Sequence, residues 1–430
     1  MGQHTSIRTQ LRALVPASDI RRQARLCGAV KRHRTIDIVE FLMATVVLVC
    51  GRGGQTIASM RRGFSRLFGA HVARSSFWSR FSLGFQRLVS WLLERLTADA
   101  RAQQPALTGR LKPFTDVLAA DSTVIKVHDD LASVWRGTRS SRAAALKVHT
   151  LIRATTGQLL RRSVTAEARN DAPEFKVGHW ARGCLFLFDR GYSSASLWWR
   201  VHRLNGYFVT RLSKIYTARI TAVNRRHRGR ARGLVGRPIK EAIVGLKRSF
   251  IDVQCSFQCQ TRPYGGDQGR RFTQEFRVVG IWQPTERRYL LLVTNLKPAN
   301  WSPTDVAELY RLRTEVETSY KTGKSGLGLN ELPSSKEHIV RTLIDAALIR
   351  AQLAMAARST AERHLPPGRW INPGQWVTVW REVIADAIAG RPIMSWKALA
   401  RLGQDPNVGR RPLRMVVAGG ENEHLCGLEA

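Results

Sequence analysis

An unbroken apolar run that ends in an aspartate, CLFLFDRGY at residues 184–192, most constrains the fold of this chain. A strand covered on both faces has this composition, because neither of its faces meets water. A helical pattern over residues 194–206 and a second short strand over 207–212 follow it. The buried strand therefore predicts a sheet that carries helices on its faces.

Three earlier runs, rich in β-branched and aliphatic residues, predict further strands of this sheet. They are DVLAADSTVIKVH at 116–128, AALKVHTLI at 144–152 and GQLLRRSVTA at 157–166. ATTGQ, at 154–158, has the composition of a hairpin turn between the last two runs. A helix is expected near 172–182. This order of elements predicts an α/β fold with a mixed sheet.

The N-terminal residues 1–112 favour helices. Apolar residues within 75–100 recur every three or four positions, which predicts one helical stripe. They are Phe77, Phe81, Phe85, Leu88, Leu92 and Leu96. Ser75 or Ser76 is expected to cap that helix. The apolar run at 41–50 is about half as long as a membrane span, so it predicts a buried helix.

The chain carries a large excess of positive charge, with 69 Lys and Arg against 32 Asp and Glu and a formal charge of +37. A chain this basic is expected to bind a polyanion, because neutralised phosphates release condensed counterions. Nucleic acid is the favoured partner, with an anionic membrane surface or an acidic protein as alternatives. Six scattered cysteines and an N-terminus unlike a signal peptide favour reduced thiols in a cytoplasm.

Residues 214–300 interrupt the alternation of strands and helices. An Arg- and Gly-rich segment at 224–237 is expected to form a loop that follows phosphates. Strand patterns follow at 249–258, 270–282 and 287–296, which together predict a β-rich insertion.

The chain is therefore expected to have five parts, with helices over 304–321 and 338–364 after the insertion. The parts are a helical, basic DNA-binding domain (1–112), the first part of a catalytic domain (113–213), the β-rich insertion (214–300), the second part of the catalytic domain with the helix 304–321 (301–365), and a helical C-terminal region, a candidate for dimerisation, with a disordered end (366–430).

Two aspartates lie at strand positions, where this residue is uncommon. Asp121 lies within VLAADSTVI, and Asp189 ends CLFLF. A carboxylate that is buried without a partner is costly, so each must form an ion pair, cap a turn or bind a metal. These alternatives stay open for each aspartate taken alone.

The helix expected after the insertion separates its two central glutamates. With about 100° per residue, Tyr310, Arg313, Glu317 and Lys324 fall on one stripe roughly 60° wide, and Glu315 lies on the other side. One carboxylate among cations and a tyrosine suits a metal ligand beside phosphate-binding groups. Ordinary salt bridges between residues four positions apart explain the same pattern.

The spacing Y-x2-R-x3-E-x6-K of Tyr310, Arg313, Glu317 and Lys324 resembles the signature of the insertion-sequence-four family of bacterial DDE transposases. Thr314 departs from that family, which often has Trp after this arginine.

Four further segments resemble the family in the same order. They are ADST around Asp121, KVHTLIRATTGQLL after it, FDRGYSS around Asp189, and LLVTNL before the signature helix. The resemblance covers residues from about 115 to 350.

The resemblance implies a ribonuclease-H-like catalytic domain that a β-rich insertion interrupts. Asp121, Asp189 and Glu317 are then expected to be catalytic residues that hold two Mg²⁺ ions, with Mn²⁺ as a substitute. The resemblance also implies DNA contacts for four neighbouring residues, with Lys321 added to the signature set. They are Tyr310, Arg313, Lys321 and Lys324.

The implied function is a DNA transposase that binds the terminal inverted repeats of its insertion sequence and catalyses strand cleavage and strand transfer. The implied partners are double-stranded DNA, as transposon ends and target, and a second copy of the chain on paired ends, with no membrane. The implied location is a bacterial cytoplasm, at the nucleoid. The alternative is a catalytically silent, domesticated transposase that only binds DNA.

Four further residues have two explanations each. Lys147 and His149 lie two apart and so on one face of a strand. His149 either orients an aspartate or is a satisfied core histidine. Trp282, near an expected hairpin tip, and Tyr289 either stack on a displaced base or pack in the core.

Overall fold

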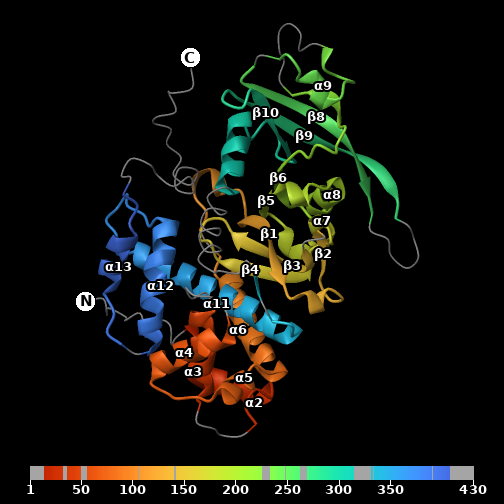
Figure 1. Cartoon of the computed structure of the whole chain (residues 1–430). Coiled ribbons are helices and arrows are strands. Elements are labelled where there is room, and N and C mark those ends of the chain that lie inside the picture. Colours follow the sequence, from red (N-terminus) through yellow and green to blue (C-terminus); the bar gives the residue numbers. More distant parts are fainter. Residues whose placement is uncertain are drawn as a thin grey trace.

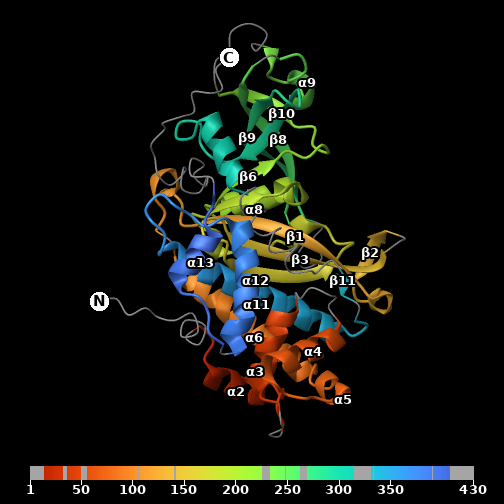
Figure 2. The same ribbon diagram turned by 60° about the vertical axis from the view of Figure 1, so that its left-hand side comes forward.

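In the computed structural model, helices from the two ends of the chain lie together beside a long twisted sheet (Figures 1 and 2). The structure describes residues 14–31, 36–49, 56–104, 106–139, 142–224, 233–246, 248–261, 269–313, 331–332, 334–389 and 391–406.

Five strands form one end of the sheet, in the order β4-β3-β1-β5-β6. They are β1 (Val117–Val127), β3 (Arg142–Arg153), β4 (Leu159–Ala166), β5 (Leu185–Phe188) and β6 (Tyr207–Arg211). β1, β3 and β4 are antiparallel neighbours, whereas β5 runs parallel to β1 and β6 runs parallel to β5. This is the strand order of a ribonuclease-H-like sheet, so the predicted fold class is confirmed.

The hairpin turn expected at residues 154–158 joins β3 to β4. Gly157 has a φ of +76° there, a conformation that side chains with a Cβ rarely adopt.

The strands expected at residues 249–296 are present, and they extend the same sheet. They are β8 (Phe250–Gln260), β9 (Arg271–Gln283) and β10 (Arg288–Thr294). β10 pairs antiparallel with β6, and the order continues through β9 and β8 to β7 (Arg219–Val223). A short helix, α9 (Ile239–Ala242), lies between β7 and β8 in the chain. Residues 225–232, from the expected Arg-rich loop, lie outside the part of the chain that the structure describes.

Two short strands complete the sheet around β1 and β3. β2 (Arg136–Arg139) pairs with β3, and β11 (Glu331–Leu332) runs parallel to the end of β1. β11 pairs with β1 at Lys126–Glu331 and Val127–Leu332. It therefore joins β1 five residues after Asp121.

The N-terminal region forms five described helices, three of them capped by a side chain. They are α2 (Ala17–Leu26), α3 (Ile38–Leu48), α4 (Ile57–Phe68), α5 (Arg74–Trp78) and α6 (Leu83–Ala102). Asp37, Thr56 and Ser82 accept hydrogen bonds from backbone N–H groups at the starts of α3, α4 and α6. The buried helix expected at residues 41–50 corresponds to α3.

The single helix expected over residues 75–100 is wrong, because the chain turns between α5 and α6. Ser82, not Ser75 or Ser76, accepts the capping hydrogen bond, from the N–H of Phe85. The apolar spacing continues across the break because Phe77 and Phe81 still pack on one side chain, Phe41, with ring centroids 5.1 and 5.3 Å away. The regular spacing of apolar residues over 75–100 therefore reflects packing on a common core and not one continuous helix.

The helix expected near residues 172–182 is also wrong. The chain forms only α7 (Asp171–Glu174) and a separate 3-10 turn at His179–Ala181. Gly178 lies between them with φ −142°, an extended conformation that a helix cannot include. The helix expected next is present as α8 (Ala195–Arg203).

The long helix α11 (Glu337–Glu362), expected at 338–364, joins the N-terminal helices to the sheet. The Gln352 side chain accepts a hydrogen bond from Leu159 N on β4 and donates one to Leu96 O on α6. Asp345 binds Arg162 of β4 at 2.7 Å and Ser90 of α6 at 2.5 Å. These buried polar contacts fix how the helices sit on the sheet.

Two C-terminal helices, α12 (Pro373–Ala389) and α13 (Trp396–Gly403), pack back on α11, and α12 also packs on α3 (Figure 2). Trp376 of α12 donates a 2.7 Å hydrogen bond to Ala354 O of α11. The end that was expected to be disordered, residues 407–430, lies outside the described residues. Among the helices that the structure describes, none is long and apolar enough to cross a membrane.

A buried ion pair joins β8 to β9 in the outer part of the sheet. Arg277 is 2% exposed and Asp252 is 1% exposed. The guanidinium donates to both carboxylate oxygens at 2.8 and 2.6 Å, and it also donates to Leu296 O. Such a bidentate pair is geometrically specific, and losing either partner leaves an uncompensated charge in the core.

Replacing Arg277 with Met should lower the free energy of unfolding by about 3–5 kcal/mol, because Asp252 is then buried without its cation. The double variant Arg277→Met/Asp252→Leu should lose less. Thermal unfolding followed by circular dichroism measures both. Arg288→Met, which breaks the exposed contact with Glu286, is the control and should leave the midpoint nearly unchanged. A double variant less stable than Arg277→Met contradicts the buried-charge explanation.

Candidate active site

Asp121 and Asp189 occupy neighbouring positions on two adjacent parallel strands. β1 pairs with β5 in parallel, with Ala120 opposite Phe188 as the last pair. Asp121 and Asp189 each follow that pair directly, and the backbone of Asp189 is still extended at φ −73° and ψ 168°. Residues in register on parallel strands point to the same face, so both carboxylates share one face of the sheet.

The packing of neighbouring residues shows which face this is. Side chains alternate along a strand, so Asp121 points to the same side as Ala119 and away from Ala120. Ala119 lies in the apolar cluster that includes Leu309, on a helix described from residue 303 to 313. Ala120 lies in the cluster on the other face. The two aspartates therefore face the helix that begins at residue 303.

Local hydrogen bonds fix the start of this helix. The Asp305 carboxylate accepts from Ser302 N at 2.8 Å, and the Ser302 hydroxyl accepts from Asp305 N at 3.2 Å. This reciprocal pair satisfies two backbone donors that a helix start leaves open. Arg110 forms ion pairs with both Asp305 and Glu308 and so ties the helix to the segment before β1.

Tyr310 and Arg313, the first two residues of the expected signature, are both buried at the end of the described part of this helix. Each is 6% exposed. Arg313 Nη2 lies 3.5 Å from Asp189 Oδ1, and the Arg313 guanidinium lies 6.0 Å from the centre of the Tyr310 ring. The Asp189 side chain is 44% exposed, so this ion pair leaves the carboxylate accessible from solvent.

Burial raises the pKa of Tyr310, although the positive charge of Arg313 opposes this rise. The hydroxyl is buried and makes no hydrogen bond of good geometry with any residue that the structure describes. A buried hydroxyl without a good partner is costly to keep.

The rest of the expected signature lies outside the described residues: Glu317, Lys321 and Lys324 all fall within 314–330. Both flanks of that segment are fixed at the site. Arg313 contacts Asp189 before it, and Glu331 pairs with Lys126 of β1 after it.

Lys147 and His149 lie on one face of β3, as expected, but it is the face opposite the Asp121 carboxylate. His149 is opposite Ser122 in the β1–β3 register, whereas Asp121 is opposite Thr150. The His149 ring nitrogens bond to the Tyr192 hydroxyl at 3.1 Å and the Thr165 hydroxyl at 2.9 Å. His149 is therefore a satisfied core histidine, and it reaches Asp121 only through Tyr192.

Both hydroxyl partners of His149 also contact main-chain oxygens. The Tyr192 hydroxyl donates to Asp121 O at 3.4 Å, and the Thr165 hydroxyl donates to Ala166 O at 3.3 Å. Each hydroxyl lies within hydrogen-bond distance of one ring nitrogen of His149. Burial lowers the pKa of His149, with the carboxylate of Asp171 opposing, and the neutral ring fits this arrangement.

Sequence reasoning missed Asp171, which lies on that opposite face. Its carboxylate accepts from Ser122 at 2.9 Å and from Lys147 at 2.8 Å. In the sequence, Asp171 lies between Glu167 and Glu174 and 24 positions from Lys147, so no local pattern distinguishes it. The fold brings Asp171 and Lys147 together.

Trp282 and Tyr289 contact each other across the β9–β10 hairpin. They are register partners, with ring centroids 5.1 Å apart, and Trp282 lies next to the hairpin turn as expected. Tyr289 is buried, and its hydroxyl donates to Arg248 O at 2.7 Å, so Tyr289 serves the core. Trp282 is partly exposed, and stacking on a base stays a prediction.

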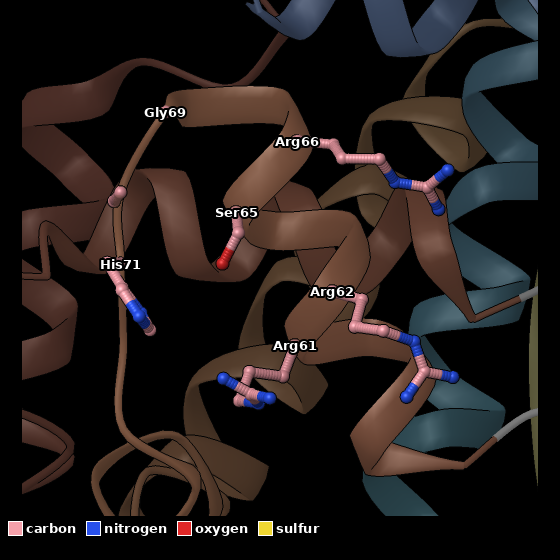
Figure 3. Close-up of a pocket in the computed structure, with 7 residues that line it drawn as sticks. Arg61, Arg62, Ser65, Arg66, Gly69 and His71 are labelled. Carbon is pink, nitrogen blue, oxygen red and sulfur yellow. The ribbon is translucent and has the colours of Figure 1, made fainter.

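A basic surface forms around α4 (Figure 3). Arg62 and Arg66, one helical turn apart, extend from one side of the helix, and with Arg61, Ser65 and His71 they line a cavity of about 600 Å³. The sequence has no Asp or Glu from residue 41 to 93. Arg61 donates to Val72 O at 2.9 Å and so holds the turn after α4 in place.

The donor set at the two aspartates fits a divalent cation only in part. Carboxylate oxygens from two adjacent strands are the hard ligands that Mg²⁺ and Mn²⁺ prefer. Within the described residues, no group of three His, Cys, Asp or Glu side chains lies close enough to hold a metal. A third carboxylate from the segment 314–330 would complete the set.

Comparison with known proteins finds a matching family and several similar solved structures. The family described as Transposase DDE domain matches residues 112–351. A cryo-EM structure of the piggyBac transposase synaptic complex with hairpin DNA is similar at a TM-score of 0.44 and 11% identity, covering 95% of this chain and 83% of that one. No curated protein matches the chain.

Stability should fall as pH drops below about 6.5, the ordinary pKa of a histidine, because His149 resists protonation in the fold. The unfolded chain then binds a proton that the folded chain excludes. The unfolding midpoint of the wild type, measured from pH 7.5 to 5, should therefore decline more steeply than that of His149→Gln. Equal slopes contradict this role.

Proposed function

Because the chain belongs to the transposase DDE domain family, we propose that it is a DNA transposase of the insertion-sequence-four type, from a bacterium. It binds the terminal inverted repeats of its element and catalyses strand cleavage and strand transfer. One observation carries the proposal. The parallel pairing of β1 with β5 puts Asp121 and Asp189 side by side, facing the helix that carries Arg313.

Asp121, Asp189 and Glu317 would hold two divalent ions, Mg²⁺ or, as a substitute, Mn²⁺. Two such ions, when bound, polarise a phosphate ester and stabilise the attacking and leaving oxygens. The short separation in sequence between Arg313 and Glu317 supports Glu317 as the third ligand. Glu317 follows Arg313 by four residues, a reach of at most about 14 Å, and Arg313 contacts Asp189.

The residues around the aspartates would hold the DNA backbone. Arg313 carries five N–H donors and would release Asp189 in part to bind a phosphate near the scissile bond. The buried Tyr310 hydroxyl would donate to a phosphate oxygen. Lys321 and Lys324 would add positive charge from the segment 314–330.

The reaction has two balanced steps. Water attacks a phosphodiester at the element end, which leaves a 3′-hydroxyl on one fragment and a 5′-phosphate on the other. The freed 3′-hydroxyl then attacks a phosphodiester of the other strand or of target DNA, forms a new phosphodiester there and releases a second 3′-hydroxyl.

The α4 surface would hold the same DNA away from the aspartates. Arg62 and Arg66 are exposed and lie in a stretch of the sequence without carboxylates, which suits phosphate contact. Because transposition joins two ends, we propose that the chain acts as a homodimer on paired ends. Its place is the nucleoid of a bacterial cytoplasm, where the substrate lies, and among the described residues the cysteines are free thiols.

The main alternative is a domesticated protein that binds element ends and does not cut them. Both hypotheses predict DNA binding, so only a measurement of DNA cleavage distinguishes them. A labelled duplex from the DNA that flanks the gene, incubated with protein and Mg²⁺, supplies the test.

Glu317→Gln should reduce cleavage of that duplex by more than about a hundredfold, because transition-state stabilisation of several kcal/mol is lost. Glu315→Gln is the matched control, two residues away on the same segment, and should cut nearly as well as the wild type. End binding, measured by gel shift, should persist in both variants.

Two results would contradict these assignments. If the wild type and Glu317→Gln bind the end equally and neither cuts it with Mg²⁺ or Mn²⁺, the binding-only alternative holds. If Glu315→Gln loses as much cleavage as Glu317→Gln, then Glu317 has no special role.

The double variant Arg62→Gln/Arg66→Gln should weaken binding to any duplex and reduce the slope of log K against log salt by about 1–2, one unit for each phosphate that the protein no longer neutralises. Arg22→Gln is the matched control. Arg22 is 71% exposed in the same helical region, lies outside the α4 surface, and pairs with Asp19, which also binds Arg95. An unchanged salt slope in the double variant removes α4 from the DNA interface.

A further inference from the structure

Asp171 joins three elements on the sheet face opposite the Asp121 and Asp189 carboxylates. It is the first residue of α7. Its Oδ2 accepts from the Ser122 hydroxyl of β1 at 2.9 Å, and its Oδ1 accepts from Lys147 Nζ of β3 at 2.8 Å. Both side chains of the Lys147–Asp171 pair are largely buried, at 17% and 11% exposure, so solvent screens this pair weakly.

The third element is the turn that follows Asp189. A Cβ placed on Gly191 would lie 2.6 Å from Asp171 Oδ2, so the turn rests directly on this carboxylate. The φ of Gly191 is outside the left-handed region, so glycine is needed here for space and not for backbone freedom. The same oxygen therefore contacts the residue after Asp121 and the turn two residues after Asp189.

Tyr192 closes this arrangement at the next residue of the turn. Its hydroxyl donates to the main-chain oxygen of Asp121 at 3.4 Å and lies 3.1 Å from His149 Nδ1. Its ring stacks on Phe188, the residue before Asp189, with centroids 5.9 Å apart. Asp171 and Tyr192 therefore each contact both the segment around Asp121 and the segment around Asp189, from the sheet face opposite the two carboxylates.

We propose that Asp171, with Lys147 and Ser122, is a positioning group that sets the separation of Asp121 and Asp189 for divalent-cation binding. This inference rests on the proposed function, because it takes the two aspartates as the cation ligands. Asp171 itself is not a ligand in this scheme: its oxygens bond to Ser122 and Lys147 on the other face of β1. Groups that orient ligands in this way control affinity by about 10–100-fold.

The experiment measures Mn²⁺ binding to the full chain by isothermal titration calorimetry, without DNA and independently of cleavage. Asp171→Asn should weaken Mn²⁺ binding by about tenfold or more, because the charge that holds Lys147 is lost while the size is kept. Ser122→Ala removes one hydrogen bond and should weaken binding by a smaller factor. Gly191→Ala places a Cβ against the Asp171 carboxylate and displaces the turn. It should weaken Mn²⁺ binding about as much as Asp171→Asn does.

Glu174→Gln is the matched control, because Glu174 lies on the same short helix and pairs only with the exposed Arg169 among the described residues. It should keep wild-type Mn²⁺ affinity. A second readout uses cleavage: the rate of Asp171→Asn should recover at high Mn²⁺ concentration, which a merely unfolded variant cannot do. Thermal midpoints of all variants identify any that fail to fold, and Ser122→Ala then carries the test.

The outcomes separate this inference from the proposed function. If Asp121→Asn abolishes Mn²⁺ binding while folded Asp171→Asn and Ser122→Ala bind as the wild type does, the positioning role is wrong and the catalytic site stands. If Asp121→Asn binds Mn²⁺ as well as the wild type, the catalytic assignment itself is wrong, and the positioning role falls with it.

Discussion

The parallel pairing of β1 with β5 is the contact on which the rest of the site depends. Each strand ends its pairing one residue before an aspartate, at Ala120 and Phe188, so the register brings two like charges to neighbouring positions. Two carboxylates at neighbouring positions repel each other, and nearby positive charge reduces this repulsion. In the free chain Arg313 supplies part of that charge.

The arginines of this chain include a class that forms buried ion pairs and a class that is exposed to solvent. Arg277, Arg153 and Arg162 are buried or largely buried and pair with aspartates inside the fold. Arg62 and Arg66 are exposed, in a region without carboxylates. In the part of the chain that the structure describes, four acidic residues and five arginines are buried, so the large excess of positive charge lies outside the core.

Much of the fold follows from local pattern. The apolar run before Asp189 predicted a strand buried on both faces, and the strand runs around Asp121 and after residue 249 predicted further strands, because burial on one or both faces dictates composition. Periodicity failed where tertiary packing crosses a break, as at Ser82 between α5 and α6. It also could not show that the later strands continue the same sheet, since pairing partners are set by the whole fold.

The site was predictable to the extent that its residues are unusual for their positions. Aspartates in strands and a tyrosine and arginine spaced for one helix face stood out, and the structure brings Asp189, Tyr310 and Arg313 together. Asp171 did not stand out, because an aspartate at the start of a short helix has an ordinary capping explanation. Its proposed role comes from contacts with Ser122, Lys147 and Gly191, which the fold brings together and no pattern in the sequence encodes.

The position of α11 has a consequence for the order in which the chain can fold. Arg350 donates to Val47 O across 303 positions of sequence, and Ser90 meets Asp345 across 255. The N-terminal helices therefore emerge from the ribosome long before the helix that covers their apolar side. Contacts this distant in sequence slow folding, and the exposed surface must stay protected from aggregation until synthesis has passed α11.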